Sequence, residues 1–119
     1  MKETLYFIFG SVVFLICGDF YDDDIIRRVT ALEPGRVFWL LARSFEEEDF
    51  DQERWDTQEM TEVIDRVKML RATTFIVNYL ASKRLTGDFC FGGAWAISGQ
   101  GDVIKSLPLG APGILMIDL

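Results

Sequence analysis

The sequence predicts an α/β domain in which one β-sheet carries helices on one of its faces. Several short runs are almost entirely apolar, as in strands that are covered on both faces. Two longer segments have apolar residues at helical spacing, and they alternate with the strand-like runs in the first part of the chain. The 119 residues are enough for one domain with a hydrophobic core of its own.

The first part of the chain predicts two strands, a helix and a third strand. Thr4–Phe9 and Val12–Cys17 are β-rich runs, and residues 10–11, Gly-Ser, predict a tight hairpin turn between them. Asp22–Leu32 has acids in its first turn and apolar residues at helical spacing. The apolar run Arg36–Ala42 then completes a β-α-β unit of the length that a parallel crossover needs.

The second half predicts one further helix, followed by strands. Asp56, with Glu59 three residues later, predicts a capping box at the start of this helix, and the acidic residues 46–51 before it predict a solvated loop. The apolar positions of the helix are Met60, Val63, Ile64, Val67 and Leu70. The strands predicted after it are Thr74–Leu80, Gly93–Ser98, Val103–Ser106 and Gly113–Leu119, with a hairpin turn at Gly99–Asp102.

Two helices are too few to cover both faces of a sheet this apolar. One face of the predicted sheet therefore has no evident cover within the chain. An exposed apolar face of that size is an interaction or aggregation surface. We expect the chain to associate with a second copy or with another polypeptide.

Composition excludes several classes of function. The formal net charge is −7, and the 12 lysines and arginines are scattered, whereas nucleic-acid binding needs them clustered. Histidine is absent, which removes the usual zinc sites and every Ser-His or Cys-His mechanism. We expect no nucleic-acid partner, no metal and no cofactor.

The two cysteines, Cys17 and Cys90, lie far apart, and nothing else indicates a secreted disulfide scaffold, so we expect reduced thiols in the cytoplasm. The N-terminal run MKETLYFIFGSVVFLIC has features of a signal peptide. However, Glu3 cancels its positive charge, Ile16 is too large for lipoprotein processing before Cys17, and the run is too short to span a bilayer. We expect no membrane attachment.

Cys17 ends a strand-like run directly before a helix that opens with three aspartates. Three interpretations are open: a buried core thiol, a lipid-attachment or cleavage site, or a nucleophile at a strand-to-helix turn. By residue type alone a buried strand-end thiol is the commoner case for Cys17, and Cys90 is interpreted as a core or surface thiol.

Several segments, taken in order, resemble the carbon–nitrogen hydrolases, or nitrilase superfamily. Residues 15–20, LICGDF, resemble the family segment in which an apolar strand delivers a nucleophilic cysteine, although Gly18 stands where an aromatic or acidic residue is usual. The matching residues there are Leu15, Ile16, Cys17 and Asp19. The further similar segments are residues 39–45 (WLLARSF), Trp55, residues 70–72 (LRA), Asn78, residues 91–104 (FGGAWAISGQGDVI) and residues 113–119 (GILMIDL).

The resemblance implies half of a four-layer αββα sandwich, with most of the second sheet absent. Residues 1–119 resemble the C-terminal half of such an enzyme, so we expect a single partial domain without the N-terminal half and the C-terminal tail. The family's catalytic glutamate and lysine precede the cysteine. Lys2 and Glu3 lie too close to it in sequence, so these two groups are expected to come from outside this chain. The partner expected is a second copy or the missing N-terminal half.

The resemblance also implies the chemistry. Cys17 would attack the carbon of an amide, nitrile or carbamoyl group of a small metabolite, with the N–H of Gly18 as an oxyanion donor. Asp24 would be a shortened substitute for an active-site carboxylate, although Asp22, Asp23 and Asp24 also form an ordinary acidic helix start. Asp19, Arg71 and Asn78 would hold the structure or line the site, with structural roles favoured for the last two.

Two alternatives remain open at this point. The chain is either part of such a hydrolase or a catalytically inactive, truncated homologue that acts as an oligomerisation or interaction module. The less favoured alternative is an unrelated small α/β protein.

Overall fold

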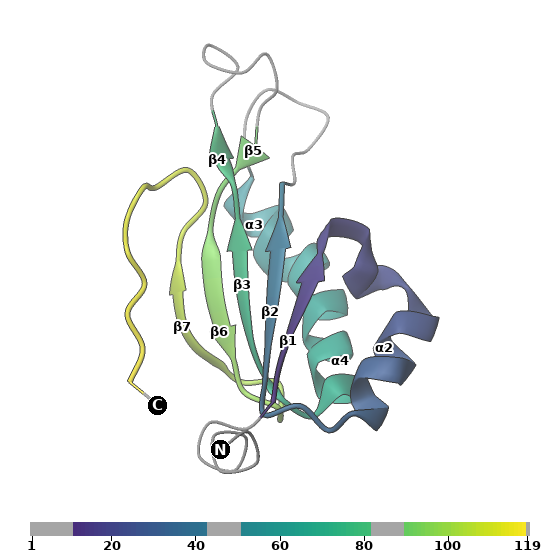
Figure 1. Cartoon of the computed structure of the whole chain (residues 1–119). Coiled ribbons are helices and arrows are strands. Elements are labelled where there is room, and N and C mark those ends of the chain that lie inside the picture. Colours follow the sequence, from purple (N-terminus) through teal and green to yellow (C-terminus); the bar gives the residue numbers. More distant parts are fainter. Residues whose placement is uncertain (1–10, 43–50, 82–89, 119) are drawn as a thin grey trace.

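The computed structural model describes residues 11–42, 51–81 and 90–118. They form a five-stranded sheet in the order β1-β2-β3-β6-β7, with helices packed against one face (Figure 1). Neighbouring strands are parallel from β1 to β3 and antiparallel from β3 to β7. The strands are β1 (Val12–Ile16), β2 (Arg36–Leu41), β3 (Thr73–Asn78), β6 (Ala94–Ile97) and β7 (Val103–Leu107). The predicted α/β class, one sheet with helices on one face, is confirmed.

The predicted β-α-β unit is also confirmed, since β1 and β2 pair in parallel and α2 (Asp23–Ala31) connects them. The side chain of Asp22 caps α2 by accepting hydrogen bonds from the N–H groups of Asp24 at 2.9 Å and Ile25 at 3.3 Å. A 3₁₀ turn, η1 (Cys17–Tyr21), which the sequence pattern did not predict, separates β1 from α2.

The second helix begins earlier than predicted, so the capping box at Asp56 is wrong. Asp51 is the N-cap instead, because its carboxylate accepts from the N–H of Arg54 at 2.9 Å. Asp56 lies inside the helix, where it accepts a hydrogen bond from Gln52 Nε2 at 3.0 Å. The helix consists of α3 (Gln52–Arg54), a π-helical segment η2 (Trp55–Glu59) and α4 (Met60–Leu70).

The strands after α4 differ from the predictions in two places. The predicted strand Thr74–Leu80 is divided: β3 ends at Asn78, and β4 (Leu80–Ala81) pairs with β5 (Cys90–Phe91) in a separate two-stranded sheet. The β6–β7 hairpin is confirmed.

The predicted last strand is wrong over residues 113–118, which are not in a strand. This segment runs beside β7 without joining the sheet (Figure 1). β-propensity alone does not supply a pairing partner. The predicted strand Thr4–Phe9 and its hairpin turn, the residues 46–50 of the acidic loop, and Leu119 lie outside the described residues.

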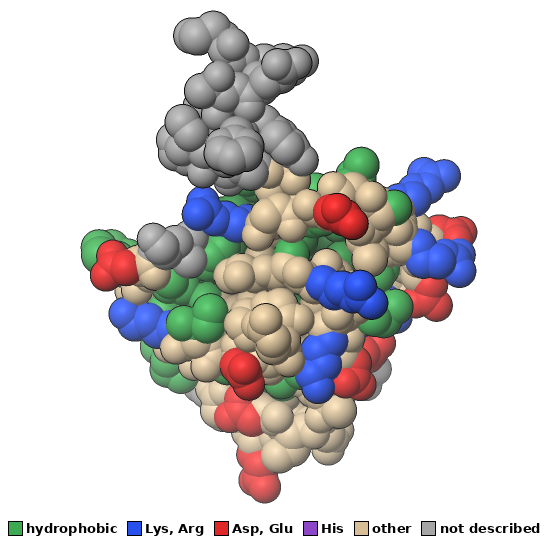
Figure 2. Space-filling model, turned by 90° about the horizontal axis from the view of Figure 1, so that it is seen from below, with side chains coloured by type: hydrophobic (Ala, Val, Ile, Leu, Met, Phe, Trp, Pro, Cys, Tyr) green, Lys and Arg blue, Asp and Glu red, His purple; other side chains and the backbone are tan. Residues whose placement is uncertain are grey.

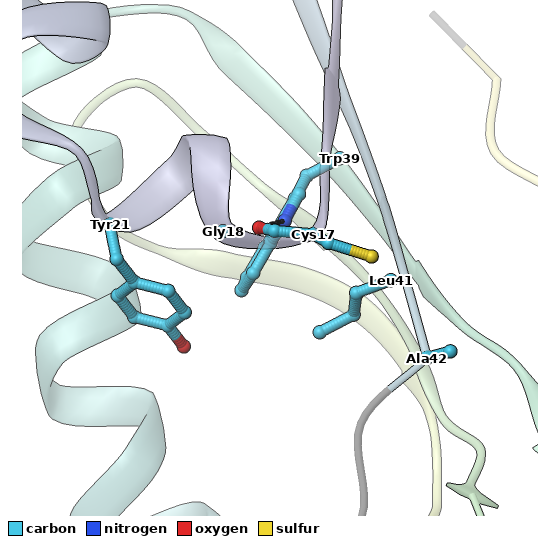
Figure 3. A pocket seen from close by; sticks show the side chains of 6 residues that line it. All are labelled: Cys17, Gly18, Tyr21, Trp39, Leu41 and Ala42. Carbon is cyan, nitrogen blue, oxygen red and sulfur yellow. Dashed lines mark hydrogen bonds between the residues drawn. The ribbon is translucent and has the colours of Figure 1, made fainter.

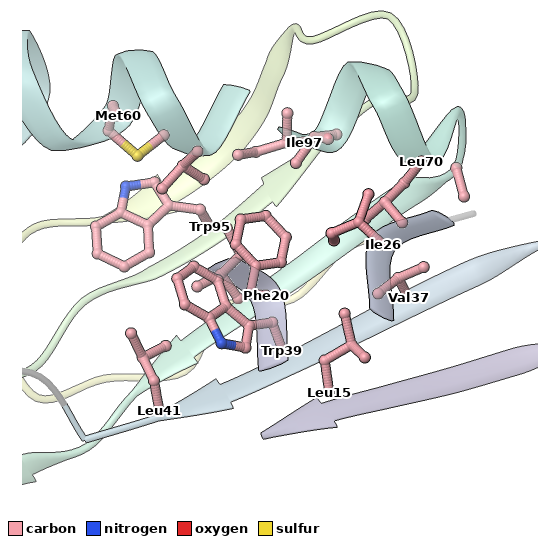
Figure 4. Packing of buried hydrophobic residues seen from close by; sticks show 14 of the residues in the cluster. Leu15, Phe20, Ile26, Val37, Trp39, Leu41, Met60, Leu70, Trp95 and Ile97 are labelled. Carbon is pink, nitrogen blue, oxygen red and sulfur yellow. The ribbon is translucent and has the colours of Figure 1, made fainter. Parts of the chain in front are cut away.

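The hydrophobic core fills the space between the sheet and the helices (Figure 4). Alternate residues of β1, β2 and β3 point into it, among them Leu15, Val37 and Ile76. The opposite face, called the open face below, carries the other residues of these strands. Phe14 stacks on Phe38 there, with ring centroids 5.3 Å apart, and Phe38 stacks on Phe75 at 4.9 Å.

Candidate functional site

The candidate site lies at the carboxyl ends of the parallel strands. Cys17 directly follows β1, and Leu41 ends β2. Ligands of open α/β sheets bind outside the carboxyl ends of their strands. A cavity of about 150 Å³ opens at this edge (Figure 3). Its lining residues are Cys17, Gly18, Tyr21, Trp39, Leu41 and Ala42.

Cys17 has a backbone conformation that is rare for a residue with a side chain. Its φ is +48°, in the left-handed region, whereas Ile16 before it is extended with φ −122° and ψ 125°. The chain therefore turns sharply at Cys17, and the thiol is exposed beside the cavity. The interpretation of Cys17 as a buried core thiol is wrong, while Cys90 is buried in β5.

Two hydrogen bonds hold this turn. Trp39 Nε1 donates to the carbonyl oxygen of Cys17 at 2.8 Å, and the carboxylate of Asp19 accepts from the N–H of Ile16 at 3.2 Å. The ring of Phe20 stacks on that of Trp39 with centroids 4.0 Å apart. Asp19 therefore has a local structural contact, and the conformation of Cys17 is over-determined by its surroundings, as a strained residue requires.

Gly18 borders open space. An added Cβ would meet no atom within 4 Å, and its N–H belongs to the first turn of η1, whose N–H groups have no acceptor within the helix. Asp24 does not line the cavity; it is exposed on α2, where its carboxylate pairs with Arg27. The aspartates after η1 thus cap and charge the start of α2.

Arg71 lies at the other end of the sheet, because it precedes β3 whereas Cys17 follows the parallel β1. It ends α4 with a left-handed φ of +56° and borders a groove of about 450 Å³ with Arg27 and Lys68. Acidic and basic side chains intermingle on this end of the molecule (Figure 2). Arg71 and Cys17 are therefore not brought together.

Asn78 holds two strand ends together and does not line the Cys17 cavity. Its side-chain Nδ2 donates to the carbonyl oxygen of Gly92 at 2.9 Å, and its own N–H donates to that of Gly93 at 3.0 Å. Gly93 has a φ of +97°, and a Cβ there would lie 2.3 Å from the Trp95 ring. A side chain at Gly93 would thus clash with Trp95.

Three residues that sequence reasoning missed shape the site: Tyr21, Trp39 and Arg66. The one sequence feature that could have pointed to Arg66 is its place directly before Val67, an apolar position of the predicted helix. In the structure the guanidinium of Arg66 contacts η1. Nothing in the sequence pattern distinguished Trp39 from the other apolar strand residues. Its contact with Cys17 depends on tertiary structure.

The described part of the cavity wall provides a thiol and backbone N–H groups. Among the described residues that line it, none is an aspartate, glutamate, lysine or arginine, so these residues supply no acid–base pair. Within residues 11–42, 51–81 and 90–118 no cluster of three or more potential ligands could hold a metal ion. In the same parts of the chain, no helix has the length and apolar character that a membrane crossing needs.

No family model matches the sequence. No curated protein matches it either. The structure is similar to the crystal structure of a carbon–nitrogen hydrolase from Helicobacter pylori G27, with a TM-score of 0.63 and 15% sequence identity. The match covers 81% of this chain but 36% of that one, so this chain spans about a third of the hydrolase's length. The chain therefore has the fold of part of a carbon–nitrogen hydrolase.

Proposed function

We propose that this chain is the nucleophile-bearing part of a carbon–nitrogen hydrolase that acts on an amide, nitrile or carbamoyl group of a small metabolite. The observation that supports this most is the geometry of Cys17. Its thiol is exposed beside a cavity, on a left-handed residue at the carboxyl end of a strand. A sharp, strained strand-to-helix turn is how other α/β hydrolases present a nucleophile.

In the proposed reaction on an amide, the thiolate of Cys17 adds to the carbonyl carbon. The N–H of Gly18 donates to the oxygen, which becomes negatively charged. Collapse of this intermediate breaks the C–N bond, and the departing amine takes a proton from a general acid. Water then hydrolyses the thioester, which releases the acid and restores the thiol.

We propose that the general acid–base glutamate and an oxyanion-binding lysine come from an N-terminal half of the domain, outside residues 1–119, that packs on the open face. Ile16 immediately precedes Cys17, and its side chain on that face is 53% exposed. A polypeptide that covered Ile16 would therefore also reach the thiol. In the alternative arrangement, two copies of this chain associate through their open faces. We place the protein in the cytoplasm, because Cys17 and Cys90 are not joined in a disulfide.

Acylation of Cys17 by p-nitrophenyl acetate tests the proposal without the missing groups. The nitrophenolate leaving group needs no proton, so attack requires only the thiol and the oxyanion donor. We expect a thioester on Cys17, formed at least about tenfold faster in the folded chain than in the same chain in urea, because oriented donors stabilise the transition state. Peptide mass spectrometry locates the adduct.

Two variants serve as controls. Cys17→Ser should abolish the adduct, whereas Cys90→Ser should leave the rate unchanged, because Cys90 is buried in β5. Acylation of Cys17 no faster in the folded chain than in urea would count against a hydrolase site and in favour of an inactive homologue.

A further inference from the structure

We infer that Arg66 is the positioning residue of the Cys17 site, although it does not line the cavity. This inference rests on the proposed role of Cys17 as a nucleophile. Arg66 lies on α4, and its side chain is 15% exposed. One guanidinium there contacts three of the residues that follow Cys17.

The first two contacts join Arg66 to the backbone of η1 and to a side chain at the start of α2. Arg66 Nη1 donates to the carbonyl oxygen of Phe20 at 3.1 Å, and Nη2 lies 3.2 Å from a carboxylate oxygen of Asp23. Phe20 is in η1 and Asp23 begins α2, so Arg66 spans the junction between the turn and the helix. Glu62, one turn earlier on α4, accepts from Arg66 Nε at 3.5 Å and helps to orient the guanidinium.

The third contact fixes a wall of the cavity. The guanidinium carbon of Arg66 lies 5.5 Å from the centroid of the Tyr21 ring, within cation–π distance. Tyr21 packs edge-to-face on Trp39, with centroids 5.4 Å apart, and Trp39 donates to the carbonyl oxygen of Cys17. Both rings line the cavity beside the thiol (Figure 3). Arg66 thus contacts the backbone that follows Cys17 and also supports the two aromatic side chains that line the cavity beside the thiol.

Arginine suits this position better than lysine. Its planar fork donates in two directions while its face stays over an aromatic ring, whereas an ammonium group is a single point charge. Asp23 contributes least, since its side chain is 74% exposed and the pair is screened by water. The contacts to Phe20 and Tyr21 are therefore the ones that position the site.

The test compares two reactions of Cys17 in the full chain. Acylation by p-nitrophenyl acetate requires the carbonyl to be seated beside the oxyanion donor, whereas alkylation by iodoacetamide requires only an accessible thiolate. The ratio of the two rates thus reports positioning, and a general loss of stability does not change it in the same way. The variants are Arg66→Met and Arg66→Lys, with Arg28→Met as the matched control, because Arg28 is exposed on α2.

We expect Arg66→Met to lower the ratio by about tenfold or more, because a misplacement on the order of 1 Å can reduce a rate by about a hundredfold. Arg66→Lys should lower it less, and Arg28→Met should leave it unchanged. If Arg66→Met does not fold, Arg66→Lys gives the deciding ratio.

An unchanged ratio in a folded Arg66 variant overturns the inference, provided that the wild-type chain is acylated faster when folded than in urea. Where the wild-type chain shows no such advantage, the proposed function itself fails. The two failures are therefore distinguishable.

Discussion

The two faces of the five-stranded sheet are built from equally apolar residues, yet only one of them is buried. On the helix face Ile76 is fully buried, whereas on the open face Phe14 is 63% exposed. Side chains alternate between the faces along each strand, so the two sets are interleaved in the sequence. The difference lies in the cover: α2 and α4 pack on one face, and the other carries the stacked row of Phe14, Phe38 and Phe75.

This comparison shows how stability and function divide between the faces. The helix face holds the core and, through Trp39, the turn that presents Cys17. The open face contributes little to the fold of this chain, but an apolar surface of this kind is a site of association. Three pairs of substitutions in the scaffold test this division, from the largest expected effect on stability to the smallest.

The largest effect is expected for a matched pair of isoleucines. Ile76→Ala should lower the free energy of unfolding by about 2–5 kcal/mol, because it leaves a cavity in the core. Ile16→Ala, on the open face, should lower it by less than about 1 kcal/mol. Urea titration followed by tryptophan fluorescence measures both. If both variants lost the same free energy of unfolding, and if this loss increased with protein concentration, the open face would be buried between two copies of the chain.

An intermediate effect is expected at the edge of the helix face. Asn78→Ala should lower the free energy of unfolding by about 1–3 kcal/mol, because it leaves the carbonyl of Gly92 without its side-chain donor. Val77→Ala is the control, since Val77 is the neighbouring residue on the open face. The same urea titration applies, and similar losses in the two variants would contradict a bracing role for Asn78.

The smallest effect on stability, and the largest on association, is expected for Phe14→Lys. A lysine on the exposed strand β1 should change the free energy of unfolding by less than about 1 kcal/mol and oppose edge and face pairing. Sedimentation velocity across a range of concentrations should show smaller species than for the wild type. Ala31→Lys, which adds the same charge on exposed α2, should not have this effect.

Much of the fold was predictable because local patterns agree with it. The β-α-β unit and the apolar face of α4 follow from alternation and helical spacing, which are properties of neighbouring residues. The start of α3 was missed because Asp51, not Asp56, accepts the capping hydrogen bond. Residues 113–118 were misjudged because strand formation needs a partner strand, which a local pattern does not reveal.

The candidate site was predictable only in part. The order of segments indicated Cys17 as a nucleophile, and the structure adds its left-handed φ and its exposure. The roles of Tyr21, Trp39 and Arg66 depend on contacts between β1, β2 and α4. These residues are far apart in the sequence, so no local pattern brings them together.

The sequence by itself determined the α/β class, the position of Cys17 at the end of a strand, and the apolar character of both sheet faces. These follow from residue type and spacing, which act over a few residues. Only the tertiary structure decided which face is covered, how sharply the chain turns at Cys17, and which arginine braces that turn. These depend on packing between distant segments, where the burial of apolar surface and the pairing of buried polar groups select one arrangement.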